Sequence, residues 1–360
     1  MNKKTPEAKI IVALTQVEEL SLKKKRDILS VLPNPTDWIS EKHAKTVEKV
    51  LGDKHKTEFL TKYSLIDSTM EEMERKEVGW VTYYDEEYPP LLRETHDFPL
   101  VLYVKGNVSL LTSDCIAVVG TRTPTRYGQK VCDSFTHDFS RAGLTVVSGF
   151  ARGVDSVAHK ACVTTDSPTI AVVASGLDVC YPAENRGLYE SILSSGGAVI
   201  SEYPLGTKPL QYHFPERNRI ISGLSRGVFL PEATLKSGSL ITARLAVEQG
   251  KELFVVPGNI NSPESEGTNK LLQEMPHALV IESEDVLSRL GVRAVSVDTE
   301  VVELNICETL IVEALHDKEL HFEELLEITS LSAGELSTML MNLEINGIIE
   351  QTGGNFYSLS

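Results

Sequence analysis

The sequence has few cysteines, and their placement excludes two common ways of stabilising a domain. Its five cysteines, an odd number, are scattered over 360 residues. None belongs to a CxxC pair, so the sequence supports neither a zinc knuckle nor a disulfide framework. We therefore expect free or buried thiols, as in the reducing cytoplasm, and no metal site.

The chain also lacks a long apolar run and an internal repeat, and we expect no export signal. No stretch approaches the roughly 20 apolar residues of a membrane helix. The short apolar run near the N-terminus is followed closely by acidic residues, unlike a secretory signal. We expect a cytoplasmic protein with no membrane partner, long enough for two or three domains.

Positive charge is scarce overall, but its distribution is uneven. The formal net charge is -16. Residues 300–360 hold one lysine against 12 acidic residues, whereas residues 113–290 hold 16 basic and 19 acidic residues. The acidity is therefore concentrated at the C-terminal end, and the rest of the chain can carry local basic patches.

Hydrophobic patterning divides the chain into five segments. Residues 1–75 carry apolar residues at helical spacing. Residues 76–112 predict a strand, a proline-rich turn and another strand, forming an entry segment. Residues 113–290 alternate apolar runs with helix-length stretches, and residues 291–304 are a linker. Residues 305–360 predict three helices and a strand pair joined by a Gly-Gly turn, which is the pattern of a winged helix.

The rhythm of residues 113–290 predicts an α/β fold with an extended, Rossmann-like parallel sheet covered on both faces. The apolar runs are 116–120, 145–149, 170–176, 198–204, 227–233, 252–258 and 278–283. Most of them end in Gly, Pro, Ser or a carboxylate at the C-terminal end. Ligands of open α/β sheets bind outside that end, so residues distant in sequence should converge on one rim.

Two loops on this rim combine small residues with one arginine. "VVGTRTPTRYG" places Gly120, Thr121 and Arg122 before a helix expected to begin near Tyr127. "SGFARGVDSVAH" repeats the theme after the next strand with residues 148, 149, 152 and 153. Exposed amides at a helix start, together with arginine, favour an anion. The spacing is not GxGxxG, which disfavours a dinucleotide cofactor.

The stretch from residue 214 to 243 adds aromatic character. Phe214 precedes Arg217, Asn218 and Arg219, and "KSGSLITA" supplies another small-residue loop before a helix. Rings interleaved with arginines suit single-stranded nucleic acid, in which bases stack and phosphates pair with guanidinium. Several anion sites on one rim exceed what a mononucleotide needs, so we expect a polyanion track.

An enzymatic interpretation remains open at this point. Asp155 and His159 lie four residues apart on one helix face, where they could form a catalytic dyad or a structural hydrogen bond. Glu202 and Glu232 end strand segments and could hydrolyse an N-glycosidic bond, hold Mg²⁺ or, alternatively, orient arginines. A nucleotide N-glycoside hydrolase is therefore the alternative to a binding protein, and a nucleotide-sensing regulator is a weaker third possibility.

Taken together, these motifs resemble the DNA-processing protein A (DprA/Smf) family over almost the whole chain. The resemblance rests on "VVGTR", "SGFARGVDSVAH", "IAVVASGLDVCYPAEN", "SEYPLGTKP", "HFPERNRIISGLS", "SGSLITARLAVEQG" and "VVPG". It implies a sterile-alpha-motif-like helical domain, the extended Rossmann domain and a winged helix. It also implies a homodimer that protects incoming single-stranded DNA and helps load the RecA recombinase in natural transformation, with no cofactor and no catalytic turnover.

The motifs and the resemblance together give a set of candidate DNA-binding residues. The set consists of Gly120, Thr121, Arg122, Ser148, Gly149, Arg152, Gly153, Phe214, Arg217, Asn218, Arg219, Ser237, Gly238 and Ser239. We expect Arg122 and Arg217 to tolerate alanine with a loss of affinity and almost no change in melting temperature. One departure from the family pattern is Pro231, which lacks a ladder donor and should end its strand early.

The winged helix itself is predicted to have a different role. Phosphate contacts supply most non-specific affinity for DNA, and one lysine against 12 acidic residues opposes them. We therefore expect residues 305–360 to contact another protein, or to pack against the rest of the chain, rather than to bind DNA.

Overall fold

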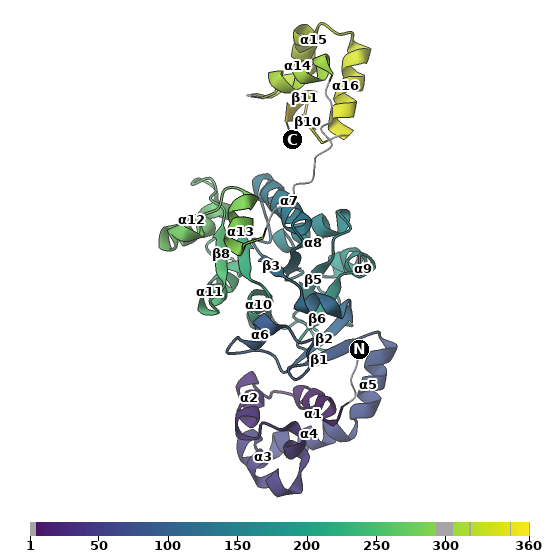
Figure 1. The fold of residues 1–360 in the computed structure, drawn as a ribbon, viewed down its shortest axis with the longest axis vertical. Helices are drawn as coiled ribbons and strands as arrows, with labels where there is room; N and C mark the ends of the chain where they lie inside the picture. The colour runs from purple at the N-terminus through teal and green to yellow at the C-terminus, as the bar shows by residue number, and fades with distance from the viewer. Residues whose placement is uncertain (1–4, 293–304, 317, 346, 360) are drawn as a thin grey trace. The chain divides into compact units, whose positions relative to one another are not determined.

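The computed structural model describes residues 5–292, 305–316, 318–345 and 347–359. The chain divides into two compact units, residues 1–295 and 296–360, and each is described by itself (Figure 1). Among the described residues, no helix combines the length and the apolar character that crossing a bilayer requires.

The first unit opens with helices gathered around α1. These helices are α1 (Pro6–Thr15), α2 (Leu22–Val31), α3 (Ala44–Leu51), α4 (Asp53–Ser64) and α5 (Ile66–Arg75). Residues 10–14 of α1 are all fully buried, so the helix is apolar on every side and packs at the centre of this group. At its end the Thr15 hydroxyl lies 2.9 Å from the buried hydroxyl of Tyr103, which belongs to the sheet.

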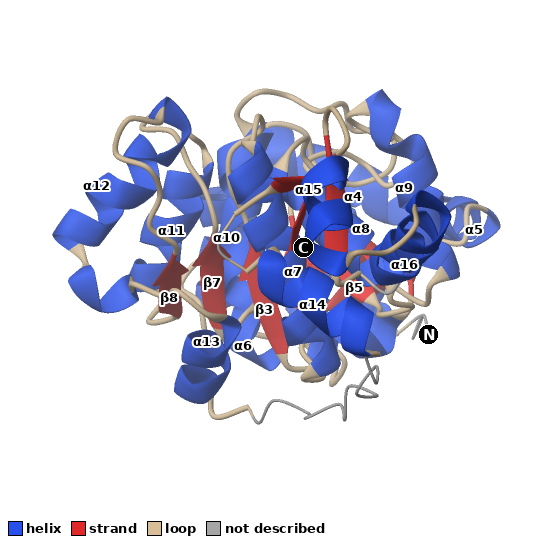
Figure 2. Cartoon of the chain, turned by 90° about the horizontal axis from the view of Figure 1, so that it is seen from above, coloured by secondary structure: helices blue, strands red, loops and turns tan. Residues whose placement is uncertain are grey.

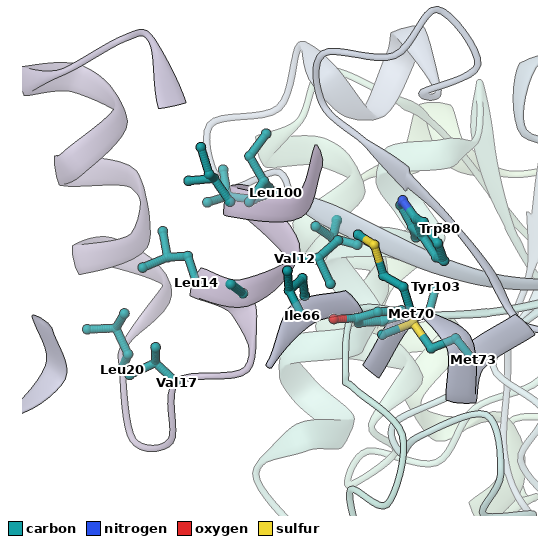
Figure 3. Close-up of a cluster of buried hydrophobic side chains, with 14 of the residues drawn as sticks. Val12, Leu14, Val17, Leu20, Ile66, Met70, Met73, Trp80, Leu100 and Tyr103 are labelled. Atoms are coloured by element: carbon teal, nitrogen blue, oxygen red, sulfur yellow. The ribbon is translucent and has the colours of Figure 1, made fainter. Parts of the chain in front are cut away.

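The helices and the sheet share one hydrophobic core. Val12 and Leu14 of α1 and Met70 of α5 belong to the same buried cluster as Trp80 and Tyr103 of the strands (Figure 3). The prediction that residues 1–75 form a separate domain is not tested by this packing. The packing does show that the helical segment covers part of the sheet.

An eight-stranded sheet forms the middle of the unit. Its strands are β1 (Gly79–Thr82), β2 (Val101–Gly106), β3 (Cys115–Val118), β4 (Thr145–Ser148), β5 (Thr169–Val172), β6 (Ala198–Ser201), β7 (Gly227–Leu230) and β8 (Glu252–Val255). The order is β1-β2-β6-β5-β4-β3-β7-β8. Strands β3 to β8 are parallel, and β1 and β2 add antiparallel pairs at the β6 edge.

Helices cover both faces of this sheet, as the continuous apolar strands predicted. One face packs against α10 (His213–Leu224), α11 (Ser239–Glu248) and the short α6 (Pro90–Arg93). The other face packs against α7 (Arg126–Arg141), α8 (Val154–Thr164), α9 (Arg186–Ser194) and α13 (Ser283–Leu290). Figure 2 shows α10 and α11 on the opposite side of β7 and β8 from α13. The remaining helix α12 (Glu266–Glu274) contributes Leu271 to the first of these faces.

Two details of the strand prediction have different outcomes. Strand β7 ends at Leu230, directly before Pro231, as expected for a residue without a ladder donor. The strand predicted at 278–283 is wrong, because only an isolated bridge joins Leu279 to Val255. The Glu282 and Asp285 capping box instead begins α13 in this stretch.

The basic run Lys23–Arg26 of α2 is in part packed against neighbouring segments of the first unit. The guanidinium carbon of Arg26 lies 4.8 Å from the centroid of the Phe98 ring. Burial lowers the pKa of Lys25, against the opposing effect of Glu202. Part of this run is therefore packed within the first unit and is not a fully solvated helix face.

The second unit is a winged helix. It contains α14 (Ile306–Ala314), β9 (Leu320–His321), α15 (Phe322–Thr329), α16 (Ala333–Ile345), β10 (Ile349–Thr352) and β11 (Phe356–Leu359). A capping box begins α16, where the Ser332 amide donates to the Glu335 carboxylate (3.0 Å). Leu336, Leu340 and Leu343 are buried in a core made of the unit's own residues. The predicted linker at 291–304 lies almost entirely outside the described residues.

Candidate nucleic-acid interface

The loop after β3 is anchored at its base and projects an exposed arginine. The Thr121 amide donates to the Glu232 carbonyl (2.8 Å), which ties the loop to the end of β7. The carboxylate of Glu232 accepts from both the amide (2.7 Å) and the hydroxyl (2.8 Å) of Thr125. Arg122 lies between these anchors, and within the described ranges it forms no ion pair. Its guanidinium remains available for an anion.

The loop after β4 meets the first loop at a glycine. Gly153 has φ +74°, and a Cβ there would lie 2.4 Å from the Thr121 carbonyl oxygen and 2.7 Å from the Arg122 Cα. Only glycine fits this contact. Phe150 in the same loop also has a positive φ, +59°, and its ring is buried in the core. The two loops are therefore locked together.

Arg217 is a buried structural residue rather than a free cation. Its guanidinium donates to the carbonyl oxygens of Gly149 and Val172, at the carboxyl ends of β4 and β5. The side chain is almost fully buried, and burial lowers the pKa of Arg217 to about 10, although the nearby Asp155 favours the charge. Our expectation that alanine would leave the melting temperature unchanged is corrected here, because the side chain bridges two strands.

Arg219 does not share a cavity with Arg217. Residues two apart on a helix differ by about 200°, so the two side chains leave α10 on opposite faces. Arg219 pairs with Glu202 and, through Nε, with Asp97 (3.6 Å). It lines a separate groove of about 850 Å³ beside the α1–α2 connection. A polyanion track through the cavity that Arg217 lines therefore does not include Arg219.

Aromatic rings gather at the mouth of the site. The guanidinium carbon of Arg122 lies 5.8 Å from the centroid of the Phe214 ring. The Tyr181 ring lies 5.7 Å from the same ring at an interplanar angle of 55°. About half of Tyr181 is exposed. Sequence reasoning missed this tyrosine, because no charge adjoins it. Its place after β5, at the carboxyl end of a parallel strand, was the available signal.

The entrance to α11 supplies hydroxyl groups. The hydroxyls of Ser237 and Ser239 lie 2.6 Å apart, and the Ser239 amide donates to Ser237 (3.3 Å). Gly238 lies between them with open space at its Cβ position. Lys236 is exposed at the same entrance and was not among the predicted residues. This edge of the site thus adds a cation and small polar groups.

These features surround a cavity of about 660 Å³, which we call the main cavity. Most of the predicted residues line it, namely Gly120, Thr121, Arg122, Phe214, Arg217, Asn218, Ser237, Gly238 and Ser239. A small adjoining cavity is lined by Gly149 and Arg152 together with Tyr181. Ser148 lies beneath the surface and donates to the Val118 carbonyl (2.6 Å). Ser148 and Gly153 therefore shape the loops rather than line a cavity.

The possible Asp155–His159 dyad is not formed. Asp155 accepts from the Ala151 amide (3.2 Å), and the Nδ1 of His159 lies 2.9 Å from the Thr169 hydroxyl. Burial lowers the pKa of His159 to about 3, so the imidazole is neutral. The histidine is a core residue joined to β5.

The carboxylates considered for hydrolysis are also engaged elsewhere. Glu232 is buried and holds Thr125, and Glu202 pairs with Arg219 on the far face of α10. Glu202 lines the groove beside the α1–α2 connection and is absent from the main cavity. In the part of the chain that the structure describes, no cluster of three metal-binding side chains occurs. These contacts disfavour an N-glycoside hydrolase.

Comparison with known families finds two matches along the chain. Residues 79–291 match the model of DNA recombination-mediator protein A, and residues 300–355 match the DprA winged helix domain. The first match alone covers more than half of the chain.

Individual proteins agree with this result. The chain is 37% identical to DNA processing protein DprA of Streptococcus pneumoniae over 279 residues, which cover 76% of this chain and 98% of that protein. It is 47% identical to Protein Smf of Escherichia coli over 203 residues, but these span only 56% of this chain and 54% of the relative.

Solved structures are similar as well. The X-ray structure of the S. pneumoniae protein superposes with a TM-score of 0.67 at 35% identity, covering 78% of this chain and 97% of that one. A structure describing the single-stranded DNA binding mode of DNA processing protein A from Helicobacter pylori superposes with a TM-score of 0.54 at 32% identity, covering 59% and 95%.

Proposed function

The chain belongs to the DNA recombination-mediator protein A (DprA/Smf) family, and from this premise we propose that it binds single-stranded DNA in the main cavity. The observation that carries the proposal is the combination, in the lining of this cavity, of Arg122 with the rings of Phe214 and Tyr181, since Arg122 forms no ion pair among the described residues. Guanidinium groups pair with phosphates, and exposed rings stack on unpaired bases. The relative from H. pylori, whose structure is described with single-stranded DNA, supports the same ligand.

Selectivity for single strands follows from the shape of the site. The rings of Tyr181 and Phe214 line both cavities, and a ring can stack only on a base whose face is not already covered by a neighbouring base pair. The hydroxyls of Ser237 and Ser239 and the exposed Lys236 offer further contacts to the phosphate backbone. We propose that the protein acts by binding and not by turnover, because the candidate carboxylates are engaged in structural contacts.

The remaining parts of the proposal concern partners. We propose that the protein protects single-stranded DNA during natural transformation, forms a homodimer and helps load the RecA recombinase. These proposals rest on membership of the family.

The test is a titration of a labelled oligothymidylate and of a duplex of equal length at several salt concentrations. We expect the single strand to bind more tightly, with an affinity that falls linearly with the logarithm of salt concentration. Equal affinity for the two ligands, or no salt dependence, contradicts the proposal. Release of free base from a nucleotide under the same conditions would support the hydrolase instead.

A further inference from the structure

Arg152, in the loop after β4, is already paired with a carboxylate of the same chain. The Nε and Nη2 atoms of Arg152 donate to the two carboxylate oxygens of Glu184, the second over 2.8 Å. Guanidinium binds two phosphate oxygens in the same bidentate geometry. Both side chains are more than half exposed, so a ligand can reach them.

Neighbouring contacts set Glu184 opposite Arg152. Glu184 belongs to the short 3-10 helix Ala183–Asn185. The side-chain Nδ2 of the next residue, Asn185, donates to the Phe150 carbonyl (3.1 Å) and to the Ser156 hydroxyl (3.0 Å). These bonds fix the Glu184 segment to the loop that carries Arg152, so the pair does not depend on the two side chains alone.

Arg122 and Arg152 therefore differ in the free protein. Both border the small adjoining cavity, yet Arg122 lacks a carboxylate partner among the described residues and Arg152 has one. The pairing lowers the pKa of Glu184 and raises the pKa of Arg152, which keeps both groups charged.

We propose that Glu184 is an affinity-determining residue that competes with a DNA phosphate for Arg152. This inference rests on the proposed single-stranded DNA binding at the same site. A strand that extends from the main cavity toward the loop after β4 must displace the Glu184 carboxylate before a phosphate can pair with Arg152. Glu184 thus weakens binding and favours release of the strand.

The experiment is a double-mutant cycle on the full chain, with a labelled oligothymidylate as ligand and anisotropy as readout. It compares the wild type with Glu184→Gln, Arg152→Gln and the double variant. Exposed ion pairs contribute modestly, so we expect Glu184→Gln to tighten binding by about two- to fivefold. In the Arg152→Gln background the same substitution should have no effect.

A matched control separates this competition from a general change of charge. Glu190 is exposed on α9 and lines neither cavity, so Glu190→Gln removes the same charge without touching Arg152. The proposal is overturned if Glu184→Gln weakens binding or leaves it unchanged, if Glu190→Gln tightens it equally, or if the effect persists without Arg152. Failure of the wild type to bind at all would instead contradict the proposed function.

Discussion

Arg122 and Arg217 both line the main cavity, but they lie in opposite environments. Arg122 is exposed and its guanidinium lies over the Phe214 ring, whereas Arg217 is buried and bonded to two carbonyl groups. Their replacement should therefore affect different properties of the protein.

For Arg122→Ala we expect weaker binding of oligothymidylate and an unchanged melting temperature. Loss of one phosphate contact should flatten the log–log salt dependence by about 0.7. Arg141→Ala is a suitable control, since Arg141 also carries a positive charge but lies at the far end of α7. A salt dependence equal to that of the wild type would rule out a phosphate contact at Arg122.

For Arg217→Ala we expect a loss of about 3 kcal/mol in the free energy of unfolding. The substitution leaves the carbonyls of Gly149 and Val172 and the buried Asp155 without their cationic partner. Tryptophan fluorescence in urea measures this effect, because both tryptophans of the chain, Trp38 and Trp80, are buried in the first unit. Stability equal to that of the wild type would show that the bridge between β4 and β5 is dispensable.

Tyr181 offers a test of base stacking. Stacking on an aromatic ring contributes about 1–3 kcal/mol per base, so Tyr181→Ala should weaken single-stranded DNA binding at least several-fold. Tyr181→Phe retains the ring and should bind like the wild type. If phenylalanine is as harmful as alanine, then the hydroxyl and not the ring face makes the contact.

At the scale of elements, the site depends on how the loops after β3 and β4 meet. Gly153→Ala would drive a Cβ into the backbone of residues 121 and 122, so we expect both lower stability and weaker DNA binding. Gly143→Ala is the matched control. Gly143 also has a positive φ, +83°, but its Cβ position is open. We expect Gly143→Ala to cost about 1 kcal/mol of stability and to leave DNA binding intact. Equal binding by both variants would show that the loop contact does not position Arg122.

Much of the sheet and its rim could be predicted from the sequence. Continuous apolar runs identify β3 to β8, and parallel strands bring their carboxyl ends to one edge, so the convergence of residues 120–122, 217 and 237–239 follows from topology. Periodicity could not reveal that Arg217 is buried, because arginine ordinarily marks a surface. The helix period already implied that Arg217 and Arg219 face different ways, and the prediction neglected it.

At the scale of the whole molecule, the acidic winged helix should not contribute to DNA affinity. Residues 300–360 carry one lysine against 12 acidic residues. The winged helix forms its core from its own residues, so its removal leaves the core of the first unit complete. We expect a chain lacking residues 300–360 to bind oligothymidylate as well as the full chain does, or more tightly. A clear loss of affinity in the same titration would assign the winged helix a direct role in binding.

The shared core of α1, α5, β1 and β2 has a consequence for N-terminal truncation of the protein. The rings of Trp80 and Tyr103 are buried in one cluster with Val12 and Met70, which come from the first 75 residues. A truncated chain that begins at β1 would expose these apolar side chains to solvent. It should therefore aggregate unless another surface covers these side chains, even though every group proposed to contact DNA would still be present.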